Sequence, residues 1–346
     1  MSRAQLTSMT ADNVVQETLV GSTGNSIKGG SVAPFVAGKN KIINGDFGIW
    51  QRGTSFAAIG NSVYNADRWF FYTDAATATV SQQAFTPGNP IAGYEPTYFH
   101  RTAVTSIGSG TYIQADQKIE NVQTFAGQTV TVSFWAKADS ARSMLIVLWQ
   151  NFGSGGSSTV TNTASGTFGT TWQRYSFTIT LPSISGKTIG AGSSLELAIR
   201  QTATAGATMD LWGVQVEAGP VATPFTTASN TLQGELALCQ RYFQRFNADS
   251  QYCPYAMAEI SSTTTAYAIL PHIVEMRTTP SSSYASAGNF ALSSTGTNFT
   301  PTGLAGSTVS KKATQITITS SSMTAGRIGR FTDYTGSSYI DLSAEL

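Results

Sequence analysis

Charged residues are scarce in this sequence. Asp, Glu, Lys and Arg make up 11 % of its 346 residues, whereas roughly 25 % is usual for a soluble protein. Ser, Thr, Gly, Asn and Gln take their place. The hydrophobic share of 41 % and the aromatic share of 11 % are ordinary, so the low charge does not indicate a disordered chain. A surface of hydroxyls and amides is typical of a long-lived extracellular assembly or of a sugar-facing surface.

Other absences narrow the function classes. The formal net charge is +1 and there is no run of Lys or Arg, so the basic footprint of a nucleic-acid-binding protein is missing. The opening residues 1–7 are not followed by the apolar segment of a signal peptide. No stretch approaches the roughly 18 apolar residues of a membrane span. We therefore expect neither nucleic-acid binding nor membrane insertion.

Reactive side chains are equally rare. Cys239 and Cys253 are the only cysteines, too few for a disulfide framework and without the neighbours of a zinc site, so we expect buried thiols. His100 and His272 are the only histidines, and no nucleophile, zinc-protease or phosphate-binding motif is present. The spacing of the 19 acidic residues indicates no glycosidase pair. We predict no catalytic residue, no required cofactor and no enzymatic activity.

Four segments follow from the hydrophobic pattern. The sequence predicts an extended N-terminal arm (1–39), a β-rich body (40–228), a connecting helix (229–247) and a C-terminal β domain (248–346). Alternating or continuous apolar runs predict strands at 130–136, 144–150, 172–181, 195–199, 211–216, 267–271, 315–319 and 339–342. Short strands separated by Gly, Ser and Pro indicate a sandwich or jelly roll. The predicted fold class is therefore all-β.

One helix is expected between the two β regions. Asn230 is predicted as its cap, with Gln233 completing a capping box. Apolar residues then recur every three to four positions through Phe243 and Phe246. We expect this helix to end near Asn247 and to form a stiff joint.

Several phrases of the sequence resemble a domain that recurs in bacteriophage tail-fibre and other virion proteins. Asn40–Gly53 resembles its opening, followed by Asn65–Trp69, and Phe134–Lys137 is similar to its central strand. Leu211–Gly219 and Thr223–Phe225 resemble its closing strand. Leu238–Phe243 and Ile340–Leu346 are similar to the helix and terminus that follow in such proteins.

This resemblance implies a jelly roll akin to carbohydrate-binding modules, a place on the particle and a homotrimer. It does not specify one ligand or one position. We expect a tail fibre or receptor-binding subunit in which residues 1–39 attach to other virion proteins, the helix packs at the three-fold axis and the C-terminal β region forms a knob. The alternatives are a capsid-decorating or tail-collar component and a polysaccharide depolymerase, although the absence of a solenoid repeat argues against an enzymatic β-helix.

Structural roles are predicted for residues of the opening phrases. Trp50 and Trp69 are expected to fill the sandwich core. Arg52 and Arg68 lie beside acidic residues in the sequence, Asp67 among them, so Arg–carboxylate pairs that lock the loops are expected.

A structural calcium ion is a subtler candidate. The jelly-roll modules that the chain resembles often hold one, and the matching positions lie near Asp46 and Asp210. Carboxylate and carbonyl oxygens are suitable ligands. Turn capping or pairing with Arg is the competing interpretation of these two acids.

Sugar binding requires exposed aromatic rings flanked by amides or carboxylates. Alternation places Trp135 on the face of its strand opposite to Val132 and Phe134. Trp149, Gln150 and Asn151 end a strand at a Gly/Ser-rich loop. These four residues are the predicted glycan-binding candidates for a host-surface glycan, with burial in the core as the competing interpretation of each Trp.

Overall fold

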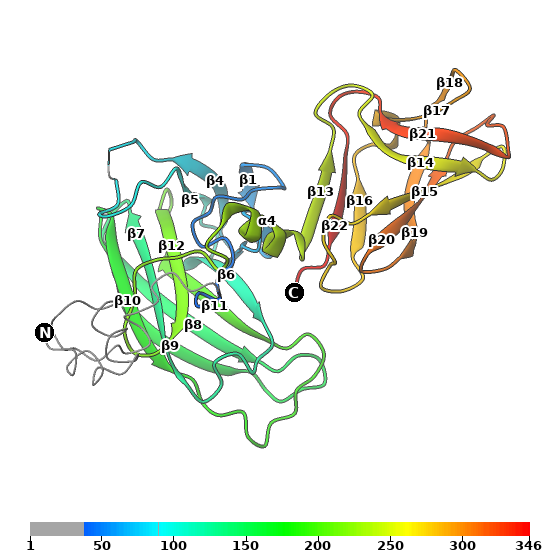
Figure 1. Cartoon of the computed structure of the whole chain (residues 1–346). Helices are drawn as coiled ribbons and strands as arrows, with labels where there is room; N and C mark the ends of the chain where they lie inside the picture. Colours follow the sequence, from blue (N-terminus) through cyan, green and yellow to red (C-terminus); the bar gives the residue numbers. More distant parts are fainter. Residues whose placement is uncertain (1–37, 89) are drawn as a thin grey trace, which may run out of the picture. The chain divides into compact units, whose positions relative to one another are not determined.

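The structure is a computed structural model that describes residues 38–88 and 90–346 (Figure 1). Nearly all of the expected N-terminal arm therefore lies outside the described residues. The rest forms two compact units. The C-terminal unit consists of Ile49–Gly53, Ala66–Arg68 and Gln233–Leu346, and the N-terminal unit contains the other described residues through Leu232. Two short loops within the expected body 40–228 thus belong to the C-terminal unit.

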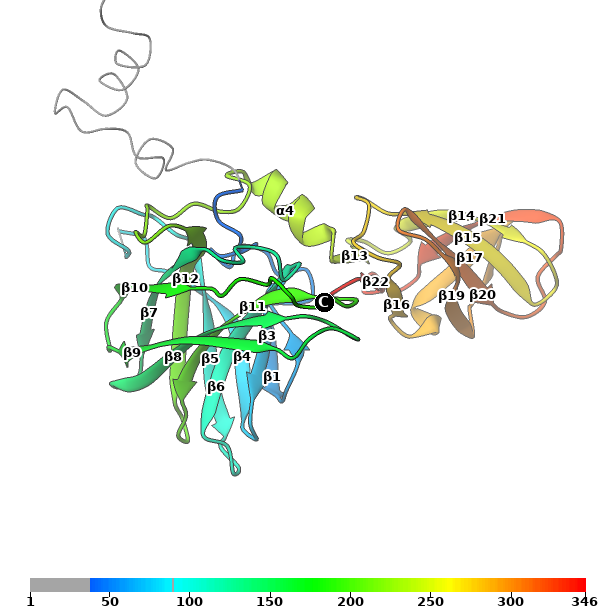
Figure 2. The ribbon, with the colours of Figure 1, turned by 90° about the horizontal axis from the view of Figure 1, so that it is seen from below.

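The N-terminal unit contains two six-stranded antiparallel sheets (Figures 1 and 2). The first sheet has the order β1 (Ser55–Ile59), β4 (Thr77–Ala84), β5 (Tyr98–Ser106), β12 (Thr208–Ala218), β7 (Thr129–Ala138) and β10 (Gln173–Thr180). The second has the order β2 (Val63–Tyr64), β3 (Phe70–Thr73), β6 (Tyr112–Glu120), β11 (Ser194–Thr202), β8 (Arg142–Asn151) and β9 (Val160–Phe168). The all-β prediction is confirmed.

Strand alternation builds the core of this unit. Successive side chains of a strand point to opposite faces of its sheet, and the inward series of β7, β8 and β11 are almost wholly apolar. Each of these three series is buried, as shown by Val130, Val132 and Phe134, by Met144, Ile146 and Leu148, and by Leu195, Leu197 and Ile199.

A second hydrophobic cluster covers the outer face of the first sheet. Trp135 of β7 and Trp212 of β12 are register partners, so both point outward, and their ring centroids are 5.3 Å apart. Strand β5 and the segments before β5, before β10 and after β12 supply the rest of this aromatic layer. It consists of Phe85, Ile91, Phe99, Trp135, Trp212 and Phe225, with Tyr94 and Trp172 at its margin. The layer buries a face that alternation alone would leave open.

Gly213 makes the close packing of the two Trp residues possible. The register of β12 shifts between Trp212 and Gln215, and Gly213 has a φ of 65°. A Cβ atom there would lie 2.8 Å from the Trp135 ring. Only glycine combines this left-handed backbone with so close an approach.

The C-terminal unit combines a three-stranded and a seven-stranded antiparallel sheet. The smaller has the order β13 (Phe243–Asn247), β22 (Tyr339–Ser343) and β16 (Ser281–Tyr284). The larger has the order β18 (Thr297–Phe299), β17 (Phe290–Ser294), β21 (Arg327–Asp333), β14 (Pro254–Ile260), β15 (Thr265–Pro271), β20 (Ala313–Thr319) and β19 (Gly303–Val309). Strands β16 to β19 lie in or begin in a Ser/Thr/Gly-rich tract where the sequence predicted no strand.

The connecting helix is shorter than expected. Helix α4 spans Leu232–Gln240, and the 3₁₀ turn η1 (Ala287–Asn289) is the other helical element among the described residues. Phe243 and Phe246 were predicted in the helix but belong to β13, whose pairing with β22 overrides the local helical pattern. The predicted cap is also wrong, because Asn230 has a left-handed φ of 62° and the helix begins two residues later. Within the described residues, no helix is long and apolar enough to span a membrane.

Buried charges hold the C-terminal unit together in an arrangement that we call the clasp. The guanidinium of Arg68 lies 3.4 Å from the Tyr242 ring centroid and donates to the Glu345 carboxylate. Arg52 donates to the other oxygen of Glu345 at 3.0 Å, and its guanidinium lies 3.5 Å from the Phe243 ring. Loops 49–53 and 66–68 are thereby bound to the last residues of the chain.

The structure tests the structural roles predicted for two Arg–carboxylate pairs and for two Trp residues. An Arg–carboxylate pair forms between Arg52 and Asp67, with N and O 3.7 Å apart. Arg68 finds its carboxylate in Glu345, which the sequence did not suggest. Trp69 is completely buried and donates to the Asn44 carbonyl at 3.0 Å, as expected of a core residue. Trp50 is half-buried in a loop of the C-terminal unit and does not fill the sandwich core.

Asp67 makes the stability of the clasp depend on pH. Burial raises its pKa from 3.8 to about 6, although Arg52 and Gln51 oppose this. A raised carboxyl pKa contributes stability below the unfolded pKa and loses it as pH rises through the folded pKa, so wild type should lose about 2 kcal/mol here between pH 4 and 7. We predict that Asp67→Asn loses less, as measured by denaturant unfolding across this range.

The difference between variant and wild type is the quantity to follow. His100 is buried with a pKa lowered to about 3, so it removes stability as pH falls below 6.5. Because both proteins contain it, its contribution cancels in the difference. Parallel pH profiles of the two proteins would contradict the prediction.

Candidate functional site

The second sheet carries a groove on its outer face, with a volume of about 370 Å³. Strands β3, β6, β11 and β8 supply most of its walls, and the loop before β9 supplies one residue. Its lining combines aromatic, amide and charged side chains: Tyr72, Tyr112, Gln114, Trp149, Asn151, Thr159, Glu196 and Arg200.

The strand register brings these residues to one face. Directly paired residues of an antiparallel sheet point to the same side. Gln114 of β6 is paired with Tyr72 on one side and with Arg200 on the other. Glu196, four positions before Arg200, is paired with Trp149 of β8. Residues more than 80 positions apart in the sequence are therefore neighbours in the groove.

The aromatic rings of the groove remain accessible. Tyr72 is 36 % exposed, and Tyr112 and Trp149 are half-buried. A ring that keeps one face open can stack on an apolar ligand face.

Arg200 is held in a defined orientation. Its guanidinium lies 3.8 Å from the centroid of the Tyr112 ring, and its Nε donates to Gln114 Oε1 at 2.8 Å. The Nε2 of Gln114 in turn donates to both oxygens of Asp116 at 2.8 and 2.9 Å. The chain Arg200–Gln114–Asp116 thus fixes the guanidinium before any ligand arrives.

Two carboxyl groups lie along the same face with different environments. Asp116 is completely buried; burial raises its pKa well above the usual value, and nearby Glu196 raises it further, against the effects of Gln114, Arg200 and Lys118. Burial also raises the pKa of the half-buried Glu196, which Lys118 partly offsets. Glu196 lines the groove, whereas Asp116 lies beneath it.

The groove includes two of the four predicted glycan-binding residues. Trp149 and Asn151 line it. Gln150 lies between them in sequence and therefore points to the opposite face, where it is buried and donates to the Pro182 carbonyl at 3.0 Å. The prediction of Gln150 as a surface residue is wrong because of strand alternation.

Trp135 is not an exposed platform. It is 7 % exposed, lies within the aromatic layer, and has the Arg174 guanidinium 4.7 Å from its ring centroid. Its strand does point it outward, as predicted, but the segments around Tyr94 and Phe225 cover that face. No ring face is left for a sugar.

The residues predicted near a calcium ion do not fit such a site. Both oxygens of Asp210 accept hydrogen bonds from Arg101 at 2.7 Å, and Lys137 Nζ lies 3.7 Å away. The competing interpretation, pairing with Arg, is therefore the one observed. Asp46 accepts a hydrogen bond from the Gly48 amide. Among residues 38–88 and 90–346, no three His, Cys, Asp or Glu side chains cluster as metal ligands.

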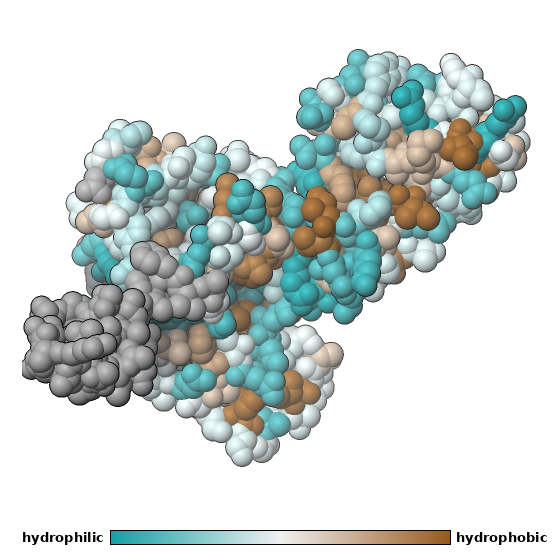
Figure 3. All heavy atoms as spheres, viewed as in Figure 1, coloured by the Kyte–Doolittle hydropathy of each residue, from teal (hydrophilic) through white to brown (hydrophobic). Residues whose placement is uncertain are grey.

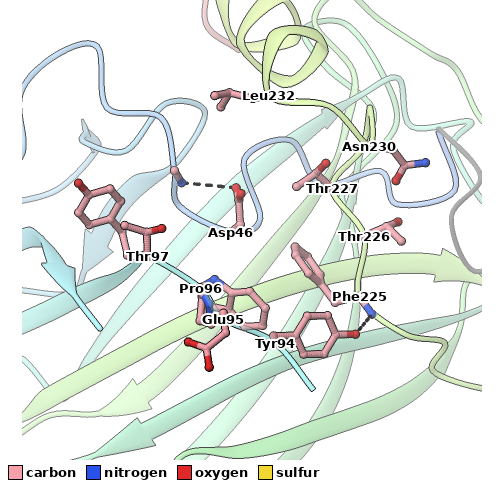
Figure 4. A pocket seen from close by; sticks show the side chains of 13 residues that line it. Asp46, Tyr94, Glu95, Pro96, Thr97, Phe225, Thr226, Thr227, Asn230 and Leu232 are labelled. Carbon is pink, nitrogen blue, oxygen red and sulfur yellow. Dashed lines mark hydrogen bonds between the residues drawn. The ribbon is translucent and has the colours of Figure 1, made fainter. Parts of the chain in front are cut away.

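A second hollow of about 760 Å³ lies beside the aromatic layer (Figure 4). Tyr94 and Phe225 lie close together in it, and the Phe225 amide donates to the Tyr94 hydroxyl at 2.8 Å. Trp212 and Phe225 are only 4 % and 6 % exposed, so these rings mainly pack against one another. We therefore regard the groove, with its accessible rings, as the better candidate for ligand binding.

Sequence reasoning missed Tyr72, Tyr112, Glu196 and Arg200. Each lies at a polar or aromatic position of an alternating strand, which marks it as outward-facing. The signal that unites them is the pairing of β3 with β6 and of β6 with β11. One sequence does not reveal that pairing.

Comparison with known proteins gives fold similarity only. No protein-family model matches the sequence. No curated protein matches it either.

Several solved structures resemble part of the chain. The enzymatically active domain of tailspike protein 4 of bacteriophage CBA120 matches 54 % of this chain and 22 % of its own, at 16 % identity and a TM-score of 0.36. The N-terminal cellulose-binding domain of a Cellulomonas fimi β-1,4-glucanase matches 44 % of this chain and 90 % of its own, at 15 % identity and a TM-score of 0.30. A cyclase from Fischerella sp. TAU matches 52 % and 96 %, at 11 % identity and a TM-score of 0.36.

These similarities transfer neither a ligand nor an activity to the chain, because the identities and TM-scores are low. The match to the tailspike spans about a fifth of that protein, 22 %.

Replacing Asp116 with Asn should stabilise the protein at pH 7. The pKa of Asp116 is raised on folding, so the stability associated with its protonated form is present below the unfolded pKa and is lost as pH rises through the folded pKa. At pH 7, folding must bury a charge or take up a proton, and Asn does neither. We therefore expect Asp116→Asn to have a higher Tm than the wild type at pH 7, measured by thermal unfolding.

The gain should shrink as pH falls toward 3.8, the usual pKa of the carboxyl, and should vanish below it, where the wild-type carboxyl is protonated in both states. Glu196→Gln serves as the comparison, because Glu196 is only half-buried and its replacement should change Tm less. A loss of stability in Asp116→Asn at pH 7 would show that the carboxylate is well compensated.

Proposed function

We propose that the chain is a non-enzymatic structural subunit of a bacteriophage particle, a tail fibre or receptor-binding subunit exposed on the particle surface. Its task would be adhesion to glycans on the host surface. The ordered phrases between Asn40 and Leu346 support the place on the particle. The observation that carries the adhesion proposal is the groove, where open aromatic rings lie beside amide and charged side chains.

This combination of side chains suits a sugar. A pyranose ring has an apolar face that packs on an aromatic ring and a rim of hydroxyls that need hydrogen-bond partners. Trp149 and Tyr72 supply rings, and Asn151 and Glu196 supply donors and acceptors. A shallow site of this size binds weakly, and several copies on one particle would multiply the binding strength.

The carboxyl groups of the groove support a binding rather than a hydrolytic role. A glycosidase needs two carboxyl groups that flank the glycosidic bond, one acid and one base or nucleophile. Asp116 is completely buried and bonded to Gln114, so it cannot reach a bond in the groove. Among the described residues, Glu196 is left as the single carboxyl group that lines the groove.

Trp149→Ala tests the adhesion proposal. Removing the ring should lower binding of the purified chain to host cells by at least about tenfold, the loss expected for a central aromatic contact. Binding of labelled protein to host cells, with Tm measured in parallel, checks this. Tyr98→Ala is the matched control, because Tyr98 is an exposed aromatic residue, 39 % accessible, that lines the second hollow.

The outcomes separate the candidate functions. Equal loss in both variants would place adhesion outside the groove. Absence of host-cell binding in the wild-type protein would favour a capsid-decorating or tail-collar role. Shortening of host polysaccharide chains during the incubation would overturn the non-enzymatic proposal.

We further propose that the chain self-associates, as a trimer according to the sequence resemblance. The seven-stranded sheet of the C-terminal unit presents three exposed aliphatic side chains, Met257, Ile269 and Ile328, which are 60 %, 63 % and 66 % accessible. They lie on adjacent strands β21, β14 and β15 (Figure 2). Figure 3 shows hydrophobic residues in small, separate groups on the face drawn there. We call the three residues the apolar sheet face.

Opposite charges within this face favour a second copy as its partner. Arg330 is paired with Met257, and Glu259 is paired with Ile328, so a cation and an anion alternate with the apolar side chains. Around a three-fold axis, the Glu259 of one copy can lie against the Arg330 of the next copy while the aliphatic groups bury one another. The alternation therefore lets this face contact the same face of neighbouring copies.

Replacing Met257, Ile269 and Ile328 together with Ser tests this association. The aliphatic burial between copies would be lost, so we expect the assembly to dissociate to monomers at concentrations where the wild type is trimeric, as measured by mass photometry. Val221→Ser is the control, because Val221 is equally exposed, 69 %, but lies in the N-terminal unit.

Two results would count against this face. A wild-type protein that is monomeric throughout the accessible range would remove the trimer proposal. A triple variant that remains trimeric would place the contact elsewhere in the chain. Attachment to other virion proteins through residues 1–39 is part of the same proposal, and residues 1–37 lie outside the described residues.

A further inference from the structure

The groove has a distinct charge at each end. Arg200 and Glu196 lie four residues apart on β11, which corresponds to about 13 Å along the strand. Arg200 is on the side of Tyr72 and Tyr112, and Glu196 is on the side of Trp149. The groove is therefore long enough for more than one sugar ring, and its two ends offer different chemistry.

Arg200 presents an unused hydrogen-bonding edge. Its Nε donates to Gln114 Oε1, and its guanidinium lies over the Tyr112 ring. Its two terminal nitrogens have no hydrogen-bond or ion-pair partner among the described residues. The other guanidiniums in this unit that lie near carboxylates, such as those of Arg101 and Arg142, are bonded to them through two nitrogens. Arg200 is thus oriented by the protein and left open toward the groove.

The nearest carboxyl group does not satisfy this edge. Asp116 is paired with Ala198, midway between Arg200 and Glu196, and its oxygens accept from Gln114. Burial raises its pKa, and both of its oxygens are occupied by Gln114, so it makes no hydrogen bond to the terminal nitrogens of Arg200. An anion from outside can therefore bind there.

We infer that the groove binds an acidic glycan, with the carboxylate of a sugar acid bound by the two terminal nitrogens of Arg200. A planar carboxylate matches the planar guanidinium through two parallel hydrogen bonds. The ring of that sugar packs against Tyr72, and the neighbouring sugar stacks on Trp149 with its hydroxyls on Asn151 and Glu196. This inference rests on the proposed glycan-binding function and specifies the class of ligand.

The fixed orientation of Arg200 favours this contact energetically. Side-chain ordering is a cost of binding, and stacking on Tyr112 together with the bond to Gln114 has already restricted the guanidinium. A neutral sugar at the same place offers hydroxyls but no charge, so it gains only the weaker neutral hydrogen bonds. The structure therefore predicts discrimination in favour of the acid.

The experiment uses the full chain on an array of glycans printed in pairs. Each pair contains a polysaccharide fragment with uronic or sialic acids and the same fragment after reduction of its carboxyl groups to alcohols. We expect at least one pair whose acid form binds at least about tenfold more tightly than its reduced form. Arg200→Gln should remove this preference, and Arg200→Lys should restore it only in part, because Lys keeps the charge but loses the planar fork.

Arg327→Gln is the matched control. Arg327 is exposed in the C-terminal unit, and its replacement changes the net charge by the same amount. It should leave the preference for the acid unchanged. Trp149→Ala should weaken binding of both members of the pair, because both stack on the ring.

The possible failures are distinguishable. Equal binding of acid and reduced forms, abolished by Trp149→Ala, would overturn the inference about Arg200 and leave the glycan-binding function standing. An acid preference that survives in Arg200→Gln would also overturn it. Binding to neither member of any pair would overturn both the inference and the proposed glycan-binding function.

Discussion

The fold of the C-terminal unit depends on how the buried guanidinium of Arg68 is paired. It lies against the Tyr242 ring and is bonded to Glu345, next to the Arg52–Asp67 pair. A buried charge without partners would cost several kcal/mol. The last residues of the chain and two loops near its beginning must therefore stay together for the C-terminal unit to hold these charges. The clasp joins Arg68 to Glu345, which lies 277 residues later in the sequence.

The strands were the most predictable part of the structure. Runs such as 130–136 and 195–199 identify strands because burial of one face imposes a period of two. The helix was predictable only to Gln240, since the pairing of Phe243–Asn247 with β22 depends on residues about 100 positions away. The strands of the Pro280–Gly306 tract were not predictable, because Ser, Thr and Gly carry little hydrophobic period. Long-range pairing stabilises these segments, and local sequence does not encode it.

The candidate site was predictable in part for the same reason. Alternation correctly placed Trp135 on the outer face of its strand but did not indicate that the segments around Tyr94 and Phe225 would cover it. Trp149 and Asn151 were found because they end a strand beside a Gly/Ser loop. Arg200 gave no local signal. Its role depends on Gln114 and Tyr112, which approach it only because β6 pairs with β11.

The difference between the two outer faces explains where a ligand can bind. On the first sheet, Trp135, Trp212 and Phe225 are packed together and almost fully buried, so their ring faces are occupied. On the second sheet, Tyr72 keeps 36 % of its surface exposed. Both faces carry aromatic residues, but only the second also has Arg200, whose plane is fixed while its outer edge stays open.

The clasp and the groove differ in how their guanidinium groups are paired. In the clasp, Arg52 and Arg68 share the two oxygens of Glu345, so the chain itself supplies the counter-charge. Beneath the groove, the completely buried Asp116 has its pKa raised by burial and accepts hydrogen bonds from the Gln114 amide, so it makes no ion pair with Arg200. A guanidinium that the fold orients but does not neutralise is stabilised most by an external anion. Because charged residues make up only 11 % of the sequence, an Arg that is fixed beside accessible aromatic rings without a carboxylate partner is an informative exception.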